Sequence, residues 1–145
     1  MKLTGPNESG VLDVWEYDLE LRNFLHGGSL ALRYWSDQKS VCEPSHAAFD
    51  PPNAGKLTAV SAGVLEGSPV QAVRYNLEES MSGWLMVTDQ YDGKIKSLIN
   101  HHTYHITASR PDLAKFLALP CGFRFDQTKG ERIWFDPEVA AMQSF

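Results

Sequence analysis

Apolar and polar side chains alternate along several short stretches of the chain, which is the pattern of half-buried β-strands. In the first stretch, 14–22, aromatic and leucine side chains take every second position and mostly charged side chains take the others. The segment 26–29, which contains two glycines, is typical of a turn, and the alternation resumes over 30–34. The sequence therefore predicts an N-terminal β-hairpin, followed over 37–56 by a long surface connection rich in proline and polar residues.

The centre of the chain predicts three more strands, at 57–64, 70–77 and 84–89. Turn signals at 66–69 separate the first two of these strands, and a turn signal at 92–93 follows the third. The segment 98–107 is rich in β-branched and aromatic residues and favours a strand, and 133–135 favours a last short one.

A helix is indicated after the strands. Ser109 is suited to cap its start, and Pro111 with Asp112 suits its first turn. Leu113, Phe116 and Leu117 would form its apolar side, and Pro120 with Gly122 would end it. A short helical turn is expected from Asp136-Pro137. These elements predict a single α+β domain over 1–145, with a twisted, mainly antiparallel sheet and one or two helices on one face.

The composition is that of an ordinary globular protein with one core, with 145 residues, 43% of them hydrophobic. The formal net charge of -5 argues against a nucleic-acid partner, which would require a concentrated basic face. It fits a basic protein partner, although many proteins are mildly acidic for solubility alone. No apolar run approaches the roughly 18 residues of a membrane span, and the first residues lack the apolar segment of a secretory signal. We therefore expect a cytoplasmic protein with no membrane partner; its oligomeric state is left open.

Few residues suggest catalysis. His101, His102 and His105 are close in sequence, but they lack the adjacent Glu of the HExxH pattern and fit partly exposed sheet positions. Cys42 and Cys121 belong to no ligand pattern and are expected as free thiols. Neither a GxSxG motif nor a phosphate-binding glycine loop is present. We therefore predict no catalytic residue, no cofactor and no metal, and keep as the alternative a small metal-dependent or thiol enzyme that uses the His cluster or Cys121.

One charged region is suggestive. Between residues 66 and 92 the chain has five acidic residues and a single basic one, Arg74. Several of the acidic residues fall at predicted turns, where loops commonly bind partners, and an intervening tyrosine is a typical interface anchor. A solvated rim is the simpler interpretation. The candidate partner-binding residues are Glu66, Glu78, Glu79, Asp89, Tyr91 and Asp92.

The order of short motifs from 57 to 136 resembles a family of bacterial immunity proteins. The motifs are VSAGVLEG at 60–67, Pro69-Val70, Arg74-Tyr75, an acidic stretch, Ser82-Gly83-Trp84, Pro111-Asp112 and LPCGF at 119–123. Members of that family are small cytosolic proteins encoded beside polymorphic or type VI secreted toxins. The chain departs from the family pattern in having Met81, where an Asp is usual, before the SGW motif, and in lacking the usual acidic turn after it.

The resemblance implies a function. It implies neutralisation of a cognate toxin by tight stoichiometric binding that occludes the toxin's active site, and no enzymatic activity. The acidic charge adds the hypothesis that this toxin is basic, for example a nuclease. Residues 1–56 fall outside the resemblance, as an N-terminal hairpin and loop extension to a core at 57–136. The SGW motif itself is best interpreted as packing, in which Gly83 allows a bulge or close backbone approach and Trp84 is buried.

Overall fold

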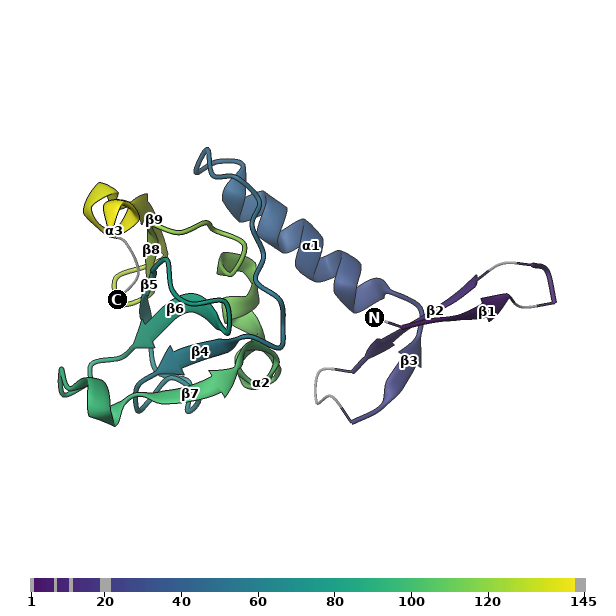
Figure 1. The fold of residues 1–145 in the computed structure, drawn as a ribbon, viewed down its shortest axis with the longest axis horizontal. Helices are drawn as coiled ribbons and strands as arrows, with labels where there is room; N and C mark the ends of the chain where they lie inside the picture. The colour runs from purple at the N-terminus through teal and green to yellow at the C-terminus, as the bar shows by residue number, and fades with distance from the viewer. Residues whose placement is uncertain (1, 7, 11, 19–21, 143–145) are drawn as a thin grey trace.

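The computed structural model describes residues 2–6, 8–10, 12–18 and 22–142, which form two sheets and several helices (Figure 1). The fold is α+β and the strand pairs are mostly antiparallel, as predicted. The strands are β1 (Lys2–Pro6), β2 (Leu12–Tyr17), β3 (Phe24–His26), β4 (Leu57–Val60), β5 (Gln71–Arg74), β6 (Met81–Val87), β7 (Ile99–His102), β8 (Phe123–Asp126) and β9 (Arg132–Phe135). The helices are α1 (Ser29–Cys42), α2 (Thr103–Ser109) and α3 (Pro137–Ala141), with 3₁₀ turns η1 (Ile95–Ser97) and η2 (Pro111–Phe116).

The larger sheet has the strand order β7-β4-β6-β5-β8-β9. The predicted strands at 57–64, 70–77 and 84–89 are therefore present as β4, β5 and β6, but β6 lies between the other two. Strand β4 runs parallel to β6, with Val60 opposite Met86, whereas β5 runs antiparallel to β6. Because β4 and β6 are parallel, their carboxyl ends meet at the same edge of the sheet.

One face of this sheet is buried under helices, as expected. Trp84 of β6 is fully buried and Phe125 of β8 nearly so, and the Phe125 ring stacks on Phe116 of η2 at 4.1 Å between ring centroids. Figure 1 shows α1 and α2 beside the strands on the same side. The indole nitrogen of Trp84 donates to the carbonyl of Leu117 at 3.2 Å. Trp84 of the SGW motif is thus a packing element, as predicted. Other members of the core are Cys42, Val60, Ala72, Met86, Ile106, Leu113, Leu117 and Phe123.

The N-terminal strands form a separate sheet of order β1-β2-β3, which projects away from the larger one (Figure 1). Here the sequence interpretation was wrong: the second strand of the predicted hairpin, 30–34, and the first part of the predicted connection, 37–42, both lie inside α1. Strand β2 pairs instead with β1 on one side and with β3 on the other. The alternation at 30–34 is too short to distinguish from a helical repeat. Leu30, Tyr34, Gln38 and Cys42 recur every fourth residue and are the less exposed side of α1.

The start of α1 depends on a residue distant in sequence. The buried carboxylate of Glu16 on β2 accepts hydrogen bonds from the backbone N–H groups of Leu30 and Ala31, both at 2.8 Å. These groups have no partner inside a helix, and a carboxylate beside them also complements the helix dipole. Because the cap comes from a different strand, no local capping signal precedes the helix.

Two further predictions need correction. The expected strand 98–107 ends at His102, and α2 begins at Thr103. Ser109 does not cap the next helix; it ends α2, and η2 begins after Arg110 without a side-chain cap. Pro111 lacks an N–H group and disfavours a helical conformation in the residue before it, so it separates the two helical pieces. The predicted apolar side of η2 and the terminal turn capped by Asp136 are confirmed.

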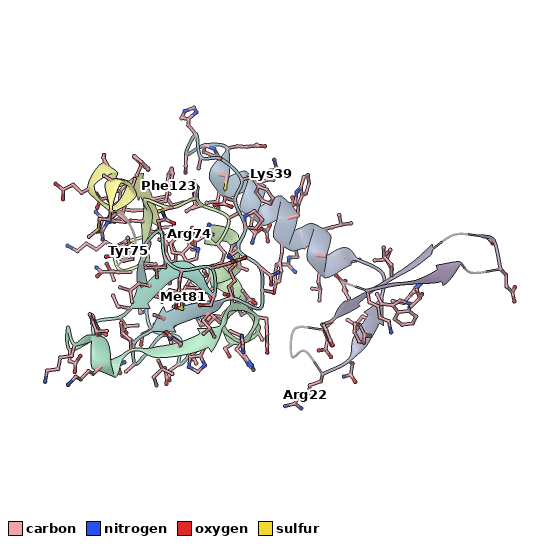
Figure 2. All side chains as sticks on the ribbon, in the orientation of Figure 1. Arg22, Lys39, Arg74, Tyr75, Met81 and Phe123 are labelled. Atoms are coloured by element: carbon pink, nitrogen blue, oxygen red, sulfur yellow. The ribbon has the colours of Figure 1, made fainter. Side chains whose placement is uncertain are left out.

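Buried Arg74 attaches the connection between α1 and β4 to the core. Its guanidinium donates to the carbonyl of Asp50 at 2.6 Å and to that of Leu119 at 2.7 Å. Burial lowers the pKa of Arg74, and the nearby Asp50 carboxylate opposes that change. In Figure 2, Arg74 lies in the larger body of the molecule, whereas Arg22 lies in the connection between β2 and β3 of the N-terminal sheet.

Candidate partner-binding site

The second face of the larger sheet is not covered by α1, α2 or η2; we call it the open face. Since successive residues of a strand point to opposite faces, the neighbours of the core residues project here. A groove of about 420 Å³ runs across it. Its lining residues are Gln71, Ala72, Val73, Tyr75, Leu85, Val87, Tyr91, Arg124, Phe125, Asp126, Arg132 and Trp134.

Aromatic and arginine side chains dominate the outer part of the groove. Trp134 of β9 is 41% exposed, and the Arg132 guanidinium lies 5.6 Å from the centroid of its indole ring. On β8, Arg124 donates to the Asp136 carboxylate at 2.7 Å. Trp, Tyr and Arg are the residues most enriched among those that dominate binding energies at protein interfaces. The open face therefore has the composition of a protein-binding surface.

A buried carboxylate fixes the position of Arg132. Asp126 of β8 is 4% exposed and accepts an Arg132 hydrogen bond at 2.8 Å. The Thr128 hydroxyl and backbone N–H, together with Arg132, stabilise the charged carboxylate, so the pKa of Asp126 falls to about 2 despite its burial. The carboxylate is therefore ionised at neutral pH and holds the guanidinium against Trp134.

Four of the six predicted binding residues lie at one edge of the larger sheet. Glu66 follows β4, and Asp89, Tyr91 and Asp92 follow β6, at the edge where these parallel strands both end. The three carboxylates are exposed, and Tyr91 lines the groove itself. We call Glu66, Asp89 and Asp92 the acidic edge. The structure thus places these acidic residues at one edge of the larger sheet.

The two loops of the acidic edge are held together by hydrogen bonds. The Thr88 hydroxyl donates to the carbonyl of Ala62 at 2.5 Å, and the Thr88 N–H donates to the Ser61 hydroxyl at 3.0 Å. Gly63 sits against them with a φ of +88°, where a Cβ would lie 2.7 Å from the Thr88 hydroxyl oxygen. Such fixed loops lose less conformational entropy when a partner binds.

Asp92 is part of a local turn. Its carboxylate accepts hydrogen bonds from the Ser97 hydroxyl at 2.6 Å and from the Lys94 N–H at 2.9 Å. These two contacts lower the pKa of Asp92, in that order of importance. Asp92 is therefore charged at neutral pH and held in one orientation.

The other two predicted residues lie elsewhere. Glu78 and Glu79 are exposed in the connection between β5 and β6, at the opposite end of β6 from the acidic edge. Strand β6 has seven residues, which corresponds to about 23 Å at roughly 3.3 Å per residue. The six residues therefore do not form one patch, and the open face lies between the two groups.

The sequence interpretation missed the centre of this surface. Trp134 was assigned to a short strand at 133–135, but Arg132, which begins β9 in the structure, was left outside it, and nothing identified which face of the strand would remain uncovered. The alternation of Arg132 and Trp134 with Ile133 and Phe135 was the available signal. This local signal does not reveal the order of the strands in the sheet, because that order depends on pairing between segments that are distant in sequence.

The histidine cluster does not have the geometry of a metal site. The three side chains are partly or fully exposed at the junction of β7 and α2. The Nδ1 atom of His102 lies 2.9 Å from the carbonyl oxygen of Gly55, and its ring stacks on Tyr104. Within the described residues no group of three or more His, Cys, Asp or Glu is placed to hold a metal ion.

Cys42 and Cys121 are free thiols, as predicted. Burial raises the pKa of Cys121, and the positive charge of Arg74 opposes this rise only in part. A thiol with a raised pKa stays protonated at neutral pH, and the thiolate is the reactive form. The environment of Cys121 therefore does not favour a nucleophile.

Comparison with known proteins gives one family match. Residues 37–136 match the family model described as the Imm33-like domain. No match to the chain was found among curated proteins or among solved structures. Among the described helices, none has both the length and the apolar character that crossing a membrane would require.

Proposed function

Because the chain belongs to the Imm33-like family of immunity-protein domains, we propose that it neutralises a cognate bacterial toxin by tight stoichiometric binding. The family match over 37–136 is the observation that carries this proposal. In this mechanism the protein occludes the active site or substrate groove of the toxin. Membership in an immunity family indicates a binding role rather than catalysis.

The open face is the surface that best suits this role. A standard interface covers about 800 Å² on each partner, and its affinity depends on a few buried aromatic and arginine anchors. Trp134 and Tyr91 lie in one groove, and Arg132 is fixed beside Trp134. A toxin lying along β6 would contact these anchors and reach Glu66, Asp89 and Asp92 at one end and Glu78 and Glu79 at the other.

Charge supports a basic toxin. The protein has a net charge of -5, and the acidic residues at both ends of the open face would steer a cationic surface toward the groove. Such steering raises the association rate and weakens with added salt. A nuclease is a toxin class with this charge. Delivery of the toxin by type VI secretion or as a polymorphic toxin, and action of the immunity protein in the cytoplasm, are further parts of this proposal.

Co-expression with the product of the adjacent gene tests the function. We expect rescue of growth and recovery of a stoichiometric complex by pull-down. Association rates are then measured for the double variant Asp89→Asn/Asp92→Asn at low and high salt. We expect slower association and a weaker salt dependence than for the wild type, with little change in the dissociation rate.

The matched control is Glu43→Gln, which removes one exposed carboxylate at the far end of α1. It should leave association nearly unchanged. Absence of rescue and binding would reject toxin neutralisation. Rescue with unchanged kinetics in the double variant would retain the function and reject the acidic edge as its site.

A further inference from the structure

A second cavity lies on the helical side of the larger sheet, away from the open face. It is a cleft of about 660 Å³, within the range of about 300–1,000 Å³ usual for ligand sites. We call it the helical cleft. It is lined by the end of β2 (Glu16, Tyr17, Asp18), the first part of α1 (Leu30, Ala31, Tyr34, Gln38), the connection before β4 (Pro52, Ala54), α2 (Thr103, Tyr104, Thr107, Ala108) and η2 with the residue after it (Ala114, Leu117).

Hydrogen bonds hold each wall of this cleft in place. Glu16 attaches β2 to the start of α1. Gln38 of α1 donates to the carbonyl of Ala114 at 3.0 Å, which joins α1 to η2. The Tyr104 N–H donates to the carbonyl of Ala54 at 3.1 Å, which joins α2 to the preceding connection. Hydrogen bonds between the elements that line the helical cleft therefore fix its walls relative to one another.

The lining has one chemical character. Its floor is formed by small and apolar side chains, and Tyr34 and Tyr104 add aromatic rings with polar tips. Two lining residues are carboxylates: Glu16 is buried and caps α1, whereas Asp18 is only half-buried and accepts hydrogen bonds from the Arg22 N–H and the Asn23 side chain. None of the described lining residues is Lys, Arg or His. An occupant complementary to this lining has apolar side chains next to positive charge.

The surroundings point to a macromolecule. Of the eleven large hydrophobic side chains exposed among the described residues, six lie before residue 37, which is one quarter of the chain. On the N-terminal sheet, Tyr17 and Phe24 stack at 4.1 Å between ring centroids, and Tyr17 also lines the cleft. The apolar surface thus continues out of the cavity onto this sheet. A small molecule would leave it exposed, whereas a polypeptide would cover it.

We infer that the helical cleft binds a segment of a partner protein that carries alternating or adjacent apolar and basic residues. The apolar side chains fill the floor between α1 and α2, and a Lys or Arg lies toward Asp18. The residues of β2 and the start of α1 that form one wall precede the family match at 37–136, whereas the other walls lie within it. It is separate from the open face, and its test is independent of toxin binding.

The probe is a short synthetic peptide in which leucine and lysine alternate, added to the isotopically labelled full chain. We expect saturable binding, with NMR shift changes concentrated at Ala31, Tyr104 and Ala108. Two control peptides replace lysine by glutamate or leucine by serine. Because both charge and apolar contact are needed, each should bind at least about tenfold more weakly. Equal binding of the serine peptide, or shifts concentrated at the acidic edge, would overturn the inference.

Two variants test the location. Ala108→Phe fills the cleft and should weaken peptide binding about tenfold or more, whereas the same change at exposed Ala48, outside the cleft, should not. Asp18→Asn should weaken the leucine–lysine peptide while Asp37→Asn on α1 does not. Analytical sedimentation of the protein without peptide tests whether two copies of the chain form a dimer. A dimer that the peptide dissociates would assign the cleft to self-association and overturn the inference.

Discussion

Gly83 of β6 lies directly against the backbone of Tyr75 at the end of β5. The Tyr75 N–H donates to the carbonyl of Gly83 at 2.8 Å, and a Cβ on Gly83 would lie only 2.2 Å from the Tyr75 carbonyl oxygen. The φ angle of Gly83 is +89°, a conformation that residues with a Cβ rarely adopt. The glycine of the SGW motif is thus required for both its conformation and its contact.

Gly83→Ala should therefore destabilise the protein by about 2 kcal/mol or more, since overpacking and backbone strain both contribute. Urea unfolding of the two proteins measures the difference. The matched control is Gly67→Ala, at a glycine with a φ of +100° and no atom within 4 Å of the added Cβ. The control variant introduces backbone strain without a steric clash, so it should lose less stability than Gly83→Ala. Equal losses in the two variants would show that the close approach to Tyr75 contributes nothing.

Removal of the Glu16 carboxylate should loosen the start of α1. Glu16→Ala leaves the N–H groups of Leu30 and Ala31 without their acceptor, so we expect a loss of about 1–2 kcal/mol. Amide hydrogen exchange at these two residues should accelerate more than elsewhere in α1. Glu43→Ala, at the carboxyl end of the helix, should change neither quantity appreciably. Unchanged protection of Leu30 and Ala31 in Glu16→Ala would contradict the capping role.

The stability of the protein should fall in acid through Asp126. Its pKa of about 2 in the folded state lies below the ordinary value, so the unfolded state binds the proton more readily. The contribution is fully present above about pH 5 and is lost as the pH falls toward 2, by about 2 kcal/mol. Asp126→Asn should be less stable than the wild type at pH 6, and its free energy of unfolding should change less with pH between 5 and 2. Urea unfolding at several pH values measures both effects. In Asp37→Asn the free energy of unfolding should depend on pH as it does in the wild type.

Trp134 should be the main anchor for the partner on the open face. Trp134→Ala should weaken binding of the cognate partner by about 2 kcal/mol or more, mostly through faster dissociation. The neighbouring Phe135 provides the control, because it projects from the other face of β9 and is 50% exposed. Titration calorimetry compares the two variants after their folding has been verified. A loss only in Phe135→Ala would place the partner on the other face.

Local patterns were sufficient for much of the larger sheet. The predicted strands at 57–64, 70–77, 84–89 and 133–135 overlap β4, β5, β6 and β9, and the buried positions of Leu113 and Phe116 follow from helical spacing. In each case the signal lies within a few consecutive residues, and tertiary packing agrees with it.

The predictions that were wrong depended on distant partners. Segment 30–34 lies in the first turns of α1, whose start is capped by Glu16, fourteen residues before Leu30. The separation of Glu66 from Glu78 and Glu79 likewise follows from the placement of β6 between β4 and β5. Trp134 became recognisable as a candidate only once the uncovered face of the sheet was known. Sequence position alone contains none of this information.

The position of β4 has a consequence for folding. Strands β5 and β6, and likewise β8 and β9, are antiparallel neighbours joined by short connections, so their pairing closes small loops. Strand β4 pairs instead with β6 and with β7, some forty residues further along, and such non-local pairing tends to form late. The contacts of Ser61 and Ala62 with Thr88, which hold the acidic edge together, depend on β4. A nascent or partly folded chain would lack that edge. Under the proposed function, toxin binding at the acidic edge should therefore begin only after β4 has inserted.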